Sequence, residues 1–465
     1  MIKNFLYGES ILTKLSKISL KSRIAHLLLF LFFLIPAFTI LGPLFPDLII
    51  SVTVLFSLIV SLKDRDKKFK QLITKDIFII SFLLFFLYLF FSSLISFIGT
   101  NNLSYENFKS FFSRSLFFFR FGLYPISFVY LVNKFNFSIT KKHLLCFLVT
   151  ILFVVFDLVF QYFNGSDIFG FIPMQRGEVA LNRLSGPFND ELIPGAFLMR
   201  YFFIFLLFIF FFTDQKKILN FIIPFSVFII LITIFLTGER AATLLSIFGI
   251  FIFFIIFKEF RLKILLSSVT CLLLVVIVLI SNPVLKKRMV NDTLFQIGIS
   301  KNLDNKEETI VKKILNTKIT KFLDSHYGAH WETAYRIWLD NKYFGIGLKQ
   351  FRNECSNAKY DDIKSKLRSI RCATHPHNSY FEILSETGLF GLLFFVFLVF
   401  SLFRKIFLIY NYNISVRLPL ISVILIVWPL ITTGSFFTNM TQIHFTFILT
   451  IILMIEKNLF KNFKI

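Results

Sequence analysis

Residues 77–98 read IFIISFLLFFLYLFFSSLISFI, a run of 22 residues without a charged side chain. A helix of this length is about 33 Å long, enough to cross the hydrocarbon core of a bilayer, which is roughly 30 Å thick. The rest of the chain is similar, because 56% of the 465 residues are hydrophobic. A soluble domain of this composition would lack polar surface. The sequence therefore predicts an all-α polytopic membrane protein.

Further apolar runs predict about twelve transmembrane helices in total. The predicted spans are residues 24–42, 44–62, 77–98, 115–132, 144–163, 194–213, 221–237, 241–257, 264–281, 383–403, 418–436 and 442–457. About 100 residues separate the ninth and tenth spans, which is too many for a simple connection. We therefore expect an N-terminal membrane domain (1–281), a periplasmic loop domain (282–382) and a C-terminal membrane domain (383–465).

The basic residues predict the orientation of the chain. A net charge of +23 is compatible with nucleic-acid binding, but the Lys and Arg residues are scattered over short loops. If the N-terminus is cytoplasmic, the seven short cytoplasmic segments hold 25 Lys and Arg residues, and the four short outer loops hold 5. This asymmetry is typical of the positive-inside rule, from which long loops are exempt. We expect a bacterial inner-membrane protein with both termini in the cytoplasm and no cleaved signal peptide.

The long loop contains its own candidate structure. Trp331, Tyr335 and Trp338 follow helical spacing and predict a helix over residues 329–341. Cys355 and Cys372 both lie in this loop, where an oxidising compartment permits a disulfide. The alternative is two free thiols.

The end of the loop contains a candidate catalytic histidine. Residues 374–382 read THPHNSYFE, in which Ser379-x-x-Glu382 predicts a capping box that opens the next helix. His377 would then lie beside a helix N-terminus, which favours an anion and a neutral imidazole. A base beside an anion site is one interpretation, and an interfacial polar histidine is the other. The histidines at 326, 330, 375 and 377 complete no recognised zinc spacing, so we expect no metal.

Arginines at membrane depth are the second group of candidates. Arg120 and Arg200 lie within apolar runs, Arg183 lies in the outer loop before the sixth span, and Arg240 lies in a very short outer turn. Charged groups at such depth are costly and suggest function, and the guanidinium group suits phosphate. Arg336 in the long loop is a further candidate.

Three of these arginines also have a structural alternative. Arg200 could pair with a neighbouring helix, and Arg240 could pair with Glu239. Arg336 has Glu332 and Asp340 at four-residue spacing, so a salt bridge along its helix is the alternative there.

Three segments resemble one known family. His377 and Asn378, followed after nine residues by Gly388 and then by Gly391, match the pattern His-[Asn/Ser/Gln]-x9-Gly-x-x-[Gly/Thr/Tyr] of bacterial O-antigen ligases. Residues 336–347, RIWLDNKYFGIG, resemble the helix and Phe-Gly-x-Gly turn of that family. Residues 237–241, TGERA, resemble its Ser-Arg-Gly segment, although Glu and Ala flank the arginine here. The chain is thus similar to the superfamily of O-antigen ligases and O-antigen polymerases.

The resemblance implies a GT-C-like membrane fold and a metal-independent, inverting glycosyltransferase without a cofactor. The donor would be a glycan on undecaprenyl pyrophosphate, and the acceptor a sugar hydroxyl such as one on lipid A-core, as in lipopolysaccharide biosynthesis. It implies that Arg240 and Arg336 bind the pyrophosphate and that His377 activates or positions the acceptor hydroxyl. The expected partners are these two glycolipids and membrane lipids.

The remaining candidate residues complete the expected site. Arg183, Arg120 and Asn378 are further candidate ligands of the pyrophosphate or glycan. Gly388 and Gly391 lie three residues apart, which would let another helix or the lipid approach closely.

Three other functions remain open from the sequence. A polysaccharide polymerase of the Wzy type shares the plan and differs in its acceptor. A transporter of lipid-linked glycans would show repeat symmetry and broken helices near the bilayer midplane, and the sequence shows no repeat. A purely structural membrane protein is the third possibility.

Overall fold

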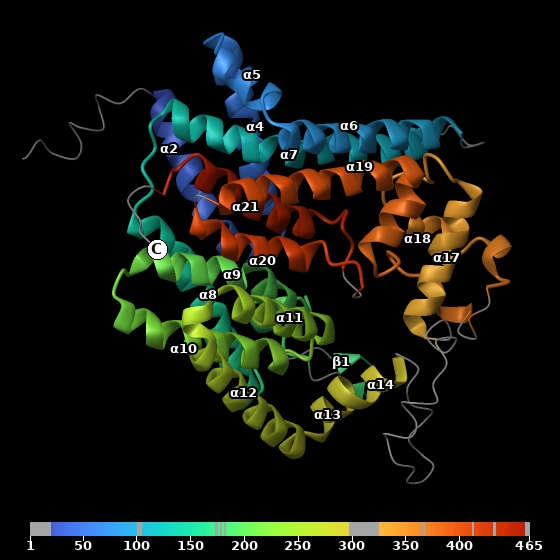
Figure 1. Ribbon diagram of the computed structural model, residues 1–465. Coiled ribbons are helices and arrows are strands. Elements are labelled where there is room, and N and C mark those ends of the chain that lie inside the picture. Colours follow the sequence, from blue (N-terminus) through green and yellow to red (C-terminus); the bar gives the residue numbers. More distant parts are fainter. Residues whose placement is uncertain are drawn as a thin grey trace, which may run out of the picture.

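The computed structural model describes ten segments of the chain. They are residues 20–99, 105–172, 175–176, 179–180, 183–296, 325–363, 365, 368–411, 413–430 and 434–460. Within these segments the protein is helical (Figure 1). The described strands are β1 (Gln175–Arg176) and β2 (Val179–Ala180), which pair in antiparallel fashion. The predicted all-α class is therefore confirmed.

Nine helices of the described chain are long and apolar enough to cross a membrane, so the protein is a multi-pass membrane protein. They are α4 (Leu44–Lys63), α6 (Ile77–Ile98), α7 (Tyr105–Lys134), α8 (Lys141–Asn164), α9 (Pro194–Phe212), α10 (Lys216–Leu236), α12 (Arg261–Ser281), α19 (Ser379–Tyr410) and α21 (Asn439–Glu456). All nine coincide with predicted spans, because length and hydropathy suffice to identify such helices.

Three predicted spans form shorter or interrupted helices. Span 24–42 consists of α2 (Leu20–Phe33) and α3 (Ile35–Ile40), which separate just before Pro36, a residue without the N–H that a continuous helix needs. Span 241–257 is α11 (Arg240–Ile256), which has 17 residues. The number of twelve crossings therefore stays a prediction.

The prediction of a helix over 418–436 is wrong beyond residue 426. Helix α20 (Arg417–Ile426) ends there, shortly before Pro429. The irregular chain that follows has its carbonyl groups satisfied inside the protein: Tyr380 Oη donates to Val427 O and Asn378 Nδ2 donates to Pro429 O, both at 2.8 Å. Irregular backbone at membrane depth is stable only where such internal partners exist.

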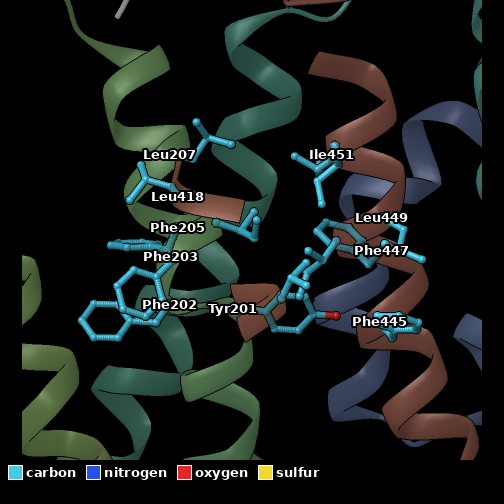
Figure 2. Close-up of a cluster of buried hydrophobic side chains, with 14 of the residues drawn as sticks. Tyr201, Phe202, Phe203, Phe205, Leu207, Leu418, Phe445, Phe447, Leu449 and Ile451 are labelled. Atoms are coloured by element: carbon cyan, nitrogen blue, oxygen red, sulfur yellow. The ribbon is translucent and has the colours of Figure 1, made fainter. Parts of the chain in front are cut away.

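The centre of the bundle is formed by α9 and α21. In each of them 83% of the most apolar stretch is buried, compared with 17% for the span that contains α12. Figure 2 shows Tyr201 reaching from α9 toward Phe447 of α21, and their ring centroids lie 5.4 Å apart at nearly right angles. Lipid tails are as apolar as these side chains, so close packing holds such helices together.

Short elements connect these helices. On the N-terminal side they are α5 (Lys67–Thr74), η1 (Gly186–Phe188), η2 (Lys258–Phe260), α13 (Pro283–Lys286), the π-helical turn η3 (Lys287–Asn291) and α14 (Asp292–Gln296). On the C-terminal side they are α17 (His326–Asp340), α18 (Phe351–Glu354), η4 (Ala358–Tyr360), η5 (Arg368–Ile370) and η6 (Ile414–Val416). Helix α17 confirms the predicted helix over 329–341. We call the end of the bundle with α17 and α18, at the right of Figure 1, the α17 end.

The loop after α17 is joined to α19 by its backbone. Ile346 N donates to Ser385 O at 3.1 Å, and Leu389 N donates to Lys342 O at 2.8 Å. Gly345 and Gly388 both have φ of +70°, and a Cβ on Gly388 would lie 2.2 Å from Tyr343 O. The segment that approaches Gly388 closely is thus the Phe-Gly-x-Gly turn. Helix α19 is kinked at Gly388. A Cβ on Gly391 would instead crowd Thr387 and Tyr88 of α6.

Candidate functional site

A cavity of about 990 Å³ opens at the α17 end, between α9, α11, α20, α21 and the residues before α19. Its polar lining includes four arginines, three histidines and three acidic residues: Arg183, Arg200, Arg240, Arg288, His375, His377, His444, Asp190, Glu191 and Glu239. Its apolar lining includes Leu244, Leu245, Leu425, Ile426 and Leu430. The cavity therefore combines cationic groups with a wall suited to hydrocarbon.

Three arginines converge on the turn between α10 and α11. Arg240 is the first residue of α11, and Gly238 in the turn has φ of +70°. Arg288 in η3 donates from Nε to Gly238 O at 2.8 Å. A Cβ on Gly238 would lie 3.2 Å from Arg288 Cδ and 3.6 Å from Arg183 Cγ. Glycine is thus required both by the turn and by the arginine side chains packed against it.

The acidic residue Glu239 lies beside Arg183 at this turn. Arg183 Nη2 donates to Leu192 O at 2.7 Å and lies 3.8 Å from Glu239 Oε1. Both Glu239 oxygens already accept backbone N–H groups at the start of α9, from Gly195 at 2.8 Å and Ala196 at 3.0 Å. Burial raises the pKa of the Glu239 carboxyl, while Arg183 and these amides oppose that shift. Glu239 therefore interacts with several guanidinium groups, and Asp292 adds a second carboxylate near Arg288.

Positive charge is crowded around Arg288. Burial first, and then the charges of Arg183 and Arg240, lower the pKa of Arg288 to about 10, although Asp292 and Glu239 oppose this shift. Nη1 of Arg240 is buried and has no hydrogen-bond partner within the described residues. An unpaired buried donor on a cation is costly, so this group of three arginines is suited to an anion.

His377 lies in the same cavity with a strained backbone. Its φ is +56°, a left-handed conformation that is uncommon outside glycine and is often found at functional sites. Its ring centroid is 4.3 Å from that of His375, 5.3 Å from that of His330 and 6.0 Å from that of Tyr327. The imidazole is therefore positioned by aromatic neighbours from α17 and from its own segment.

His330 links His377 to the disulfide region of the loop. It is 1% exposed, its Nδ1 donates to Arg371 O at 2.9 Å, and burial lowers its pKa. Cys355 and Cys372 form a disulfide, with their Cα atoms 5.2 Å apart. Arg371 directly precedes Cys372, so the disulfide restrains the carbonyl group that orients His330.

The N-cap of α19 is Asn378, and the predicted capping box of Ser379 and Glu382 is wrong. Asn378 Oδ1 accepts from the N–H groups of Tyr380 at 2.9 Å and Phe381 at 3.2 Å. Glu382 is buried and its carboxylate accepts from Phe436 N at 2.7 Å and from the Ser435 hydroxyl. The short Asn side chain reaches the first-turn amides, while Glu382 satisfies an irregular segment that the sequence does not reveal.

This correction changes the roles of the neighbouring residues. His377 still lies immediately before a helix N-terminus, and Ser379 lines the cavity. The Asn378 amide, in contrast, is occupied by the cap and by Pro429 O. Its expected role as a substrate ligand therefore remains a prediction, without an accessible amide to support it.

Arg120 lies outside the large cavity. It contacts Asp47 through Nε at 2.9 Å and Nη2 at 2.6 Å, and Asn439 Nδ2 also donates to Asp47 at 3.0 Å. It lines a separate cavity of about 360 Å³.

Arg336 also lies outside the large cavity. Its Nη2 lies 3.5 Å from Glu332 and 3.1 Å from Asp362 O, and its Nη1 contacts the Asp362 carboxylate. The pairing with Glu332 was the structural alternative in the sequence, whereas the contact with Asp362 could not be predicted from it.

Two further arginines of the cavity differ in how visible they are in the sequence. Nη2 of Arg200 in α9 lies 3.4 Å from Thr441 Oγ1 of α21. This is the pairing with a neighbouring helix that was the structural alternative for Arg200 in the sequence. Arg288 was missed, since only its place directly after the ninth span, in the sequence Lys286-Lys287-Arg288, could have marked it. In the described part of the chain, no three His, Cys, Asp or Glu residues are grouped as metal ligands would be.

Comparison with known proteins finds a family to which part of the chain is similar. Residues 225–396 match a family model described as O-antigen ligase. The match includes Arg240, Arg288, α17 and the His377-to-Gly391 pattern. No curated protein matches the chain. Members of the matched family are glycosyltransferase-like enzymes that act on lipid-linked glycans in a membrane. Over residues 225–396, the chain is therefore similar to the O-antigen ligase family, which supports the resemblance found in the sequence.

Proposed function

We propose that the protein is an O-antigen ligase-type glycosyltransferase. It would transfer a glycan from undecaprenyl pyrophosphate to a sugar hydroxyl, such as one on lipid A-core, at the outer face of the bacterial inner membrane. One observation carries this proposal: His377 lines the same cavity as Arg183, Arg240 and Arg288. A candidate base and a candidate diphosphate site are thus adjacent.

The arginines would bind the donor. As the glycosidic bond breaks, negative charge grows on the pyrophosphate oxygen, and preorganised guanidinium groups stabilise that charge more in the transition state than in the ground state. The buried, unpartnered Nη1 of Arg240 is the group best prepared for this contact. The apolar wall with Leu244 and Leu425 would accept the polyprenyl chain.

His377 would act on the acceptor. The acceptor oxygen forms a bond to the anomeric carbon while the bond from that carbon to the pyrophosphate oxygen breaks. The hydroxyl proton moves to His377, and undecaprenyl pyrophosphate leaves. A single displacement of this kind inverts the anomeric carbon, and a positioned base typically contributes ~10²–10⁴-fold to the rate.

The orientation is part of the proposal. The Lys and Arg asymmetry of the short loops supports cytoplasmic termini, so the α17 end would be periplasmic. A reporter fused after residue 300 should be periplasmic, and one fused after residue 68 cytoplasmic. The opposite result at both positions would put His377 and Arg240 in the wrong compartment. The regions 1–281, 282–382 and 383–465 remain the proposed domains.

The function can be tested by reconstitution. Proteoliposomes with a lipid-linked glycan and lipid A-core should form the ligated product with the wild-type protein. His377→Ala should reduce transfer by at least about 100-fold at unchanged abundance and Tm, since an interfacial histidine adds little packing. His375→Ala is the matched control and should do less.

Two outcomes would change the assignment. An active His377→Ala variant would remove this site from catalysis. Transfer only to a growing lipid-linked glycan, and not to lipid A-core, would identify the Wzy-type polymerase, which would use the same site.

A further inference from the structure

A second polar cavity, of about 790 Å³, lies at the opposite end of the bundle from the candidate site. It lies among α5, α6, α7, α19 and α21 (Figure 1). Helix α21 contributes Thr441 and His444 to the first cavity and Glu456 to this one. Helix α19 likewise extends from Ser379 in the first cavity to Arg404 and Leu408 in this one. The two cavities are therefore separated by the length of a membrane-spanning helix.

All three carboxylates that line this cavity are already paired with lysines. Lys405, whose side chain is 7% exposed, contacts Asp76 and lies 2.7 Å from Glu456. Lys134 lies 2.9 Å from Asp66. These pairs connect the ends of α6, α7, α19 and α21 and leave little negative charge for further cations.

Additional basic residues around the same cavity remain uncompensated. Lys68, Lys75 and Arg404 line it and are exposed, and no carboxylate in the described chain pairs with any of them. Lys457 adds a fourth positive charge. It lies 3.8 Å from the Glu456 carboxylate, but that carboxylate already pairs with Lys405. The cavity thus has a surplus of positive charge.

The other wall of the cavity is apolar and faces outward. Ile77 of α6 is 48% exposed and Leu408 of α19 is 58% exposed, and both line the cavity beside the basic residues. Helix α5 has the character of an interfacial helix, because Phe69 is buried against Tyr130 while its lysines are exposed. A ligand here would meet cations at one end and hydrocarbon-facing side chains at the other.

We propose that this cavity binds the phosphate headgroup of an anionic membrane phospholipid. Lys68, Lys75, Arg404 and Lys457 would surround the phosphate, and an acyl chain would lie along Ile77 and Leu408. Basic pockets between transmembrane helices are a known way to bind such headgroups. The apolar wall favours a lipid over free phosphate, which has no hydrocarbon to place there. This inference does not depend on the proposed glycan transfer.

The test measures lipid binding to the purified full-length protein. Phosphatidylglycerol should bind in native mass spectrometry and raise the Tm, while phosphatidylcholine, inorganic phosphate and glycerol phosphate should not. The variant Lys75→Glu with Arg404→Glu should bind phosphatidylglycerol at least about ten-fold more weakly, since each basic residue contributes appreciably to such binding. The control Lys63→Glu with Lys258→Glu makes the same charge change at the same end but outside the cavity, and should bind normally.

Three results would overturn the proposal. They are unchanged phosphatidylglycerol binding in the cavity variant, an equal loss in the control variant, and displacement of the lipid by inorganic phosphate at comparable concentration. Since Lys75 and Arg404 are exposed and unpaired, the variant should fold. If its Tm without lipid falls, Lys75→Gln with Arg404→Gln makes the same measurement without adding negative charge.

Discussion

The candidate arginines of the α17 end form two groups that differ in their partners. Arg120 and Arg336 each face a carboxylate directly, Asp47 and Asp362. In the other group, Arg183 lies 3.8 Å from Glu239, whose two oxygens already accept backbone amides, and Nη1 of Arg240 has no hydrogen-bond partner within the described residues. Charge and depth in the sequence do not separate these groups. The difference teaches that an arginine is best prepared for a substrate where the fold leaves a buried donor without a hydrogen-bond partner, as at Nη1 of Arg240.

The largest effect is expected at Arg240. Arg240→Ala should reduce glycan transfer by at least about 100-fold, because it removes a preorganised donor from the developing charge. Arg240→Lys should rescue poorly, since it lacks the planar fork that meets two phosphate oxygens. The measurement is initial transfer rate at matched protein abundance.

Arg120 and Arg336 are the controls for that comparison. Arg120→Ala should mainly lower stability, by about 1–3 kcal/mol, because it leaves Asp47 without its partner. Arg336→Ala should likewise affect the stability of the loop more than transfer. If either variant keeps its Tm and still loses as much transfer as Arg240→Ala, then the paired arginines also serve the substrate.

Arg288 is expected to have the next largest effect. Arg288→Ala should reduce transfer about ten-fold, because it removes one of three charges and the hydrogen bond to Gly238 O. Lys287→Ala changes the neighbouring, exposed charge and should transfer normally. Equal loss in both variants would show that this segment acts through general charge and not through Arg288.

The disulfide should have a smaller effect on transfer and a clear effect on stability. Unreduced protein should yield linked peptides containing Cys355 and Cys372 in mass spectrometry. Replacing both with Ala should cost about 3 kcal/mol of stability, because the bridge closes a loop with a sequence separation of 17 residues. The control replaces the free Cys146 and Cys271 with Ala, which leaves the disulfide-closed loop unchanged. Alkylation of both loop cysteines in intact cells would contradict the bridge.

The smallest effect is a pH dependence of stability at His330. Burial lowers the pKa of His330 below the ordinary histidine value of 6.5, so the folded protein prefers the neutral ring. As the pH falls below 6.5, the unfolded state therefore binds more protons than the folded state. The free energy of unfolding decreases there by at most about 1.4 kcal/mol per pH unit. His330→Asn keeps a donor for Arg371 O and should lose this dependence. If the Tm of the wild-type protein and the Tm of His330→Asn fall equally at acid pH, the proposed dependence on His330 is contradicted.

Much of the fold follows from the sequence, since hydropathy and length identify the nine long spans. The end of α20 does not, because it depends on donors from Tyr380 and Asn378, which lie far away in the chain. The kink at Gly388 is another example. The glycine is visible in the sequence, but the turn that approaches it lies about 45 residues earlier.

The site follows from the sequence in part. His377, Arg183 and Arg240 were candidates, and all three line the large cavity. Arg120 lies outside this cavity, and its pairing could not be foreseen, because its partner Asp47 is 73 residues away in the chain and no local pattern links them. Its role as a substrate ligand stays a prediction. Arg288 was missed because it is one of 18 basic residues in the long loop, without a motif of its own.

The most direct test of the account is binding of glycan-free undecaprenyl pyrophosphate, which cannot undergo transfer. The wild-type protein and His377→Ala should bind it equally, because the histidine acts on the acceptor, whereas Arg240→Ala should bind it at least about ten-fold more weakly. Equal binding by all three proteins would contradict the central claim that Arg240 and the arginines packed beside it form the pyrophosphate site.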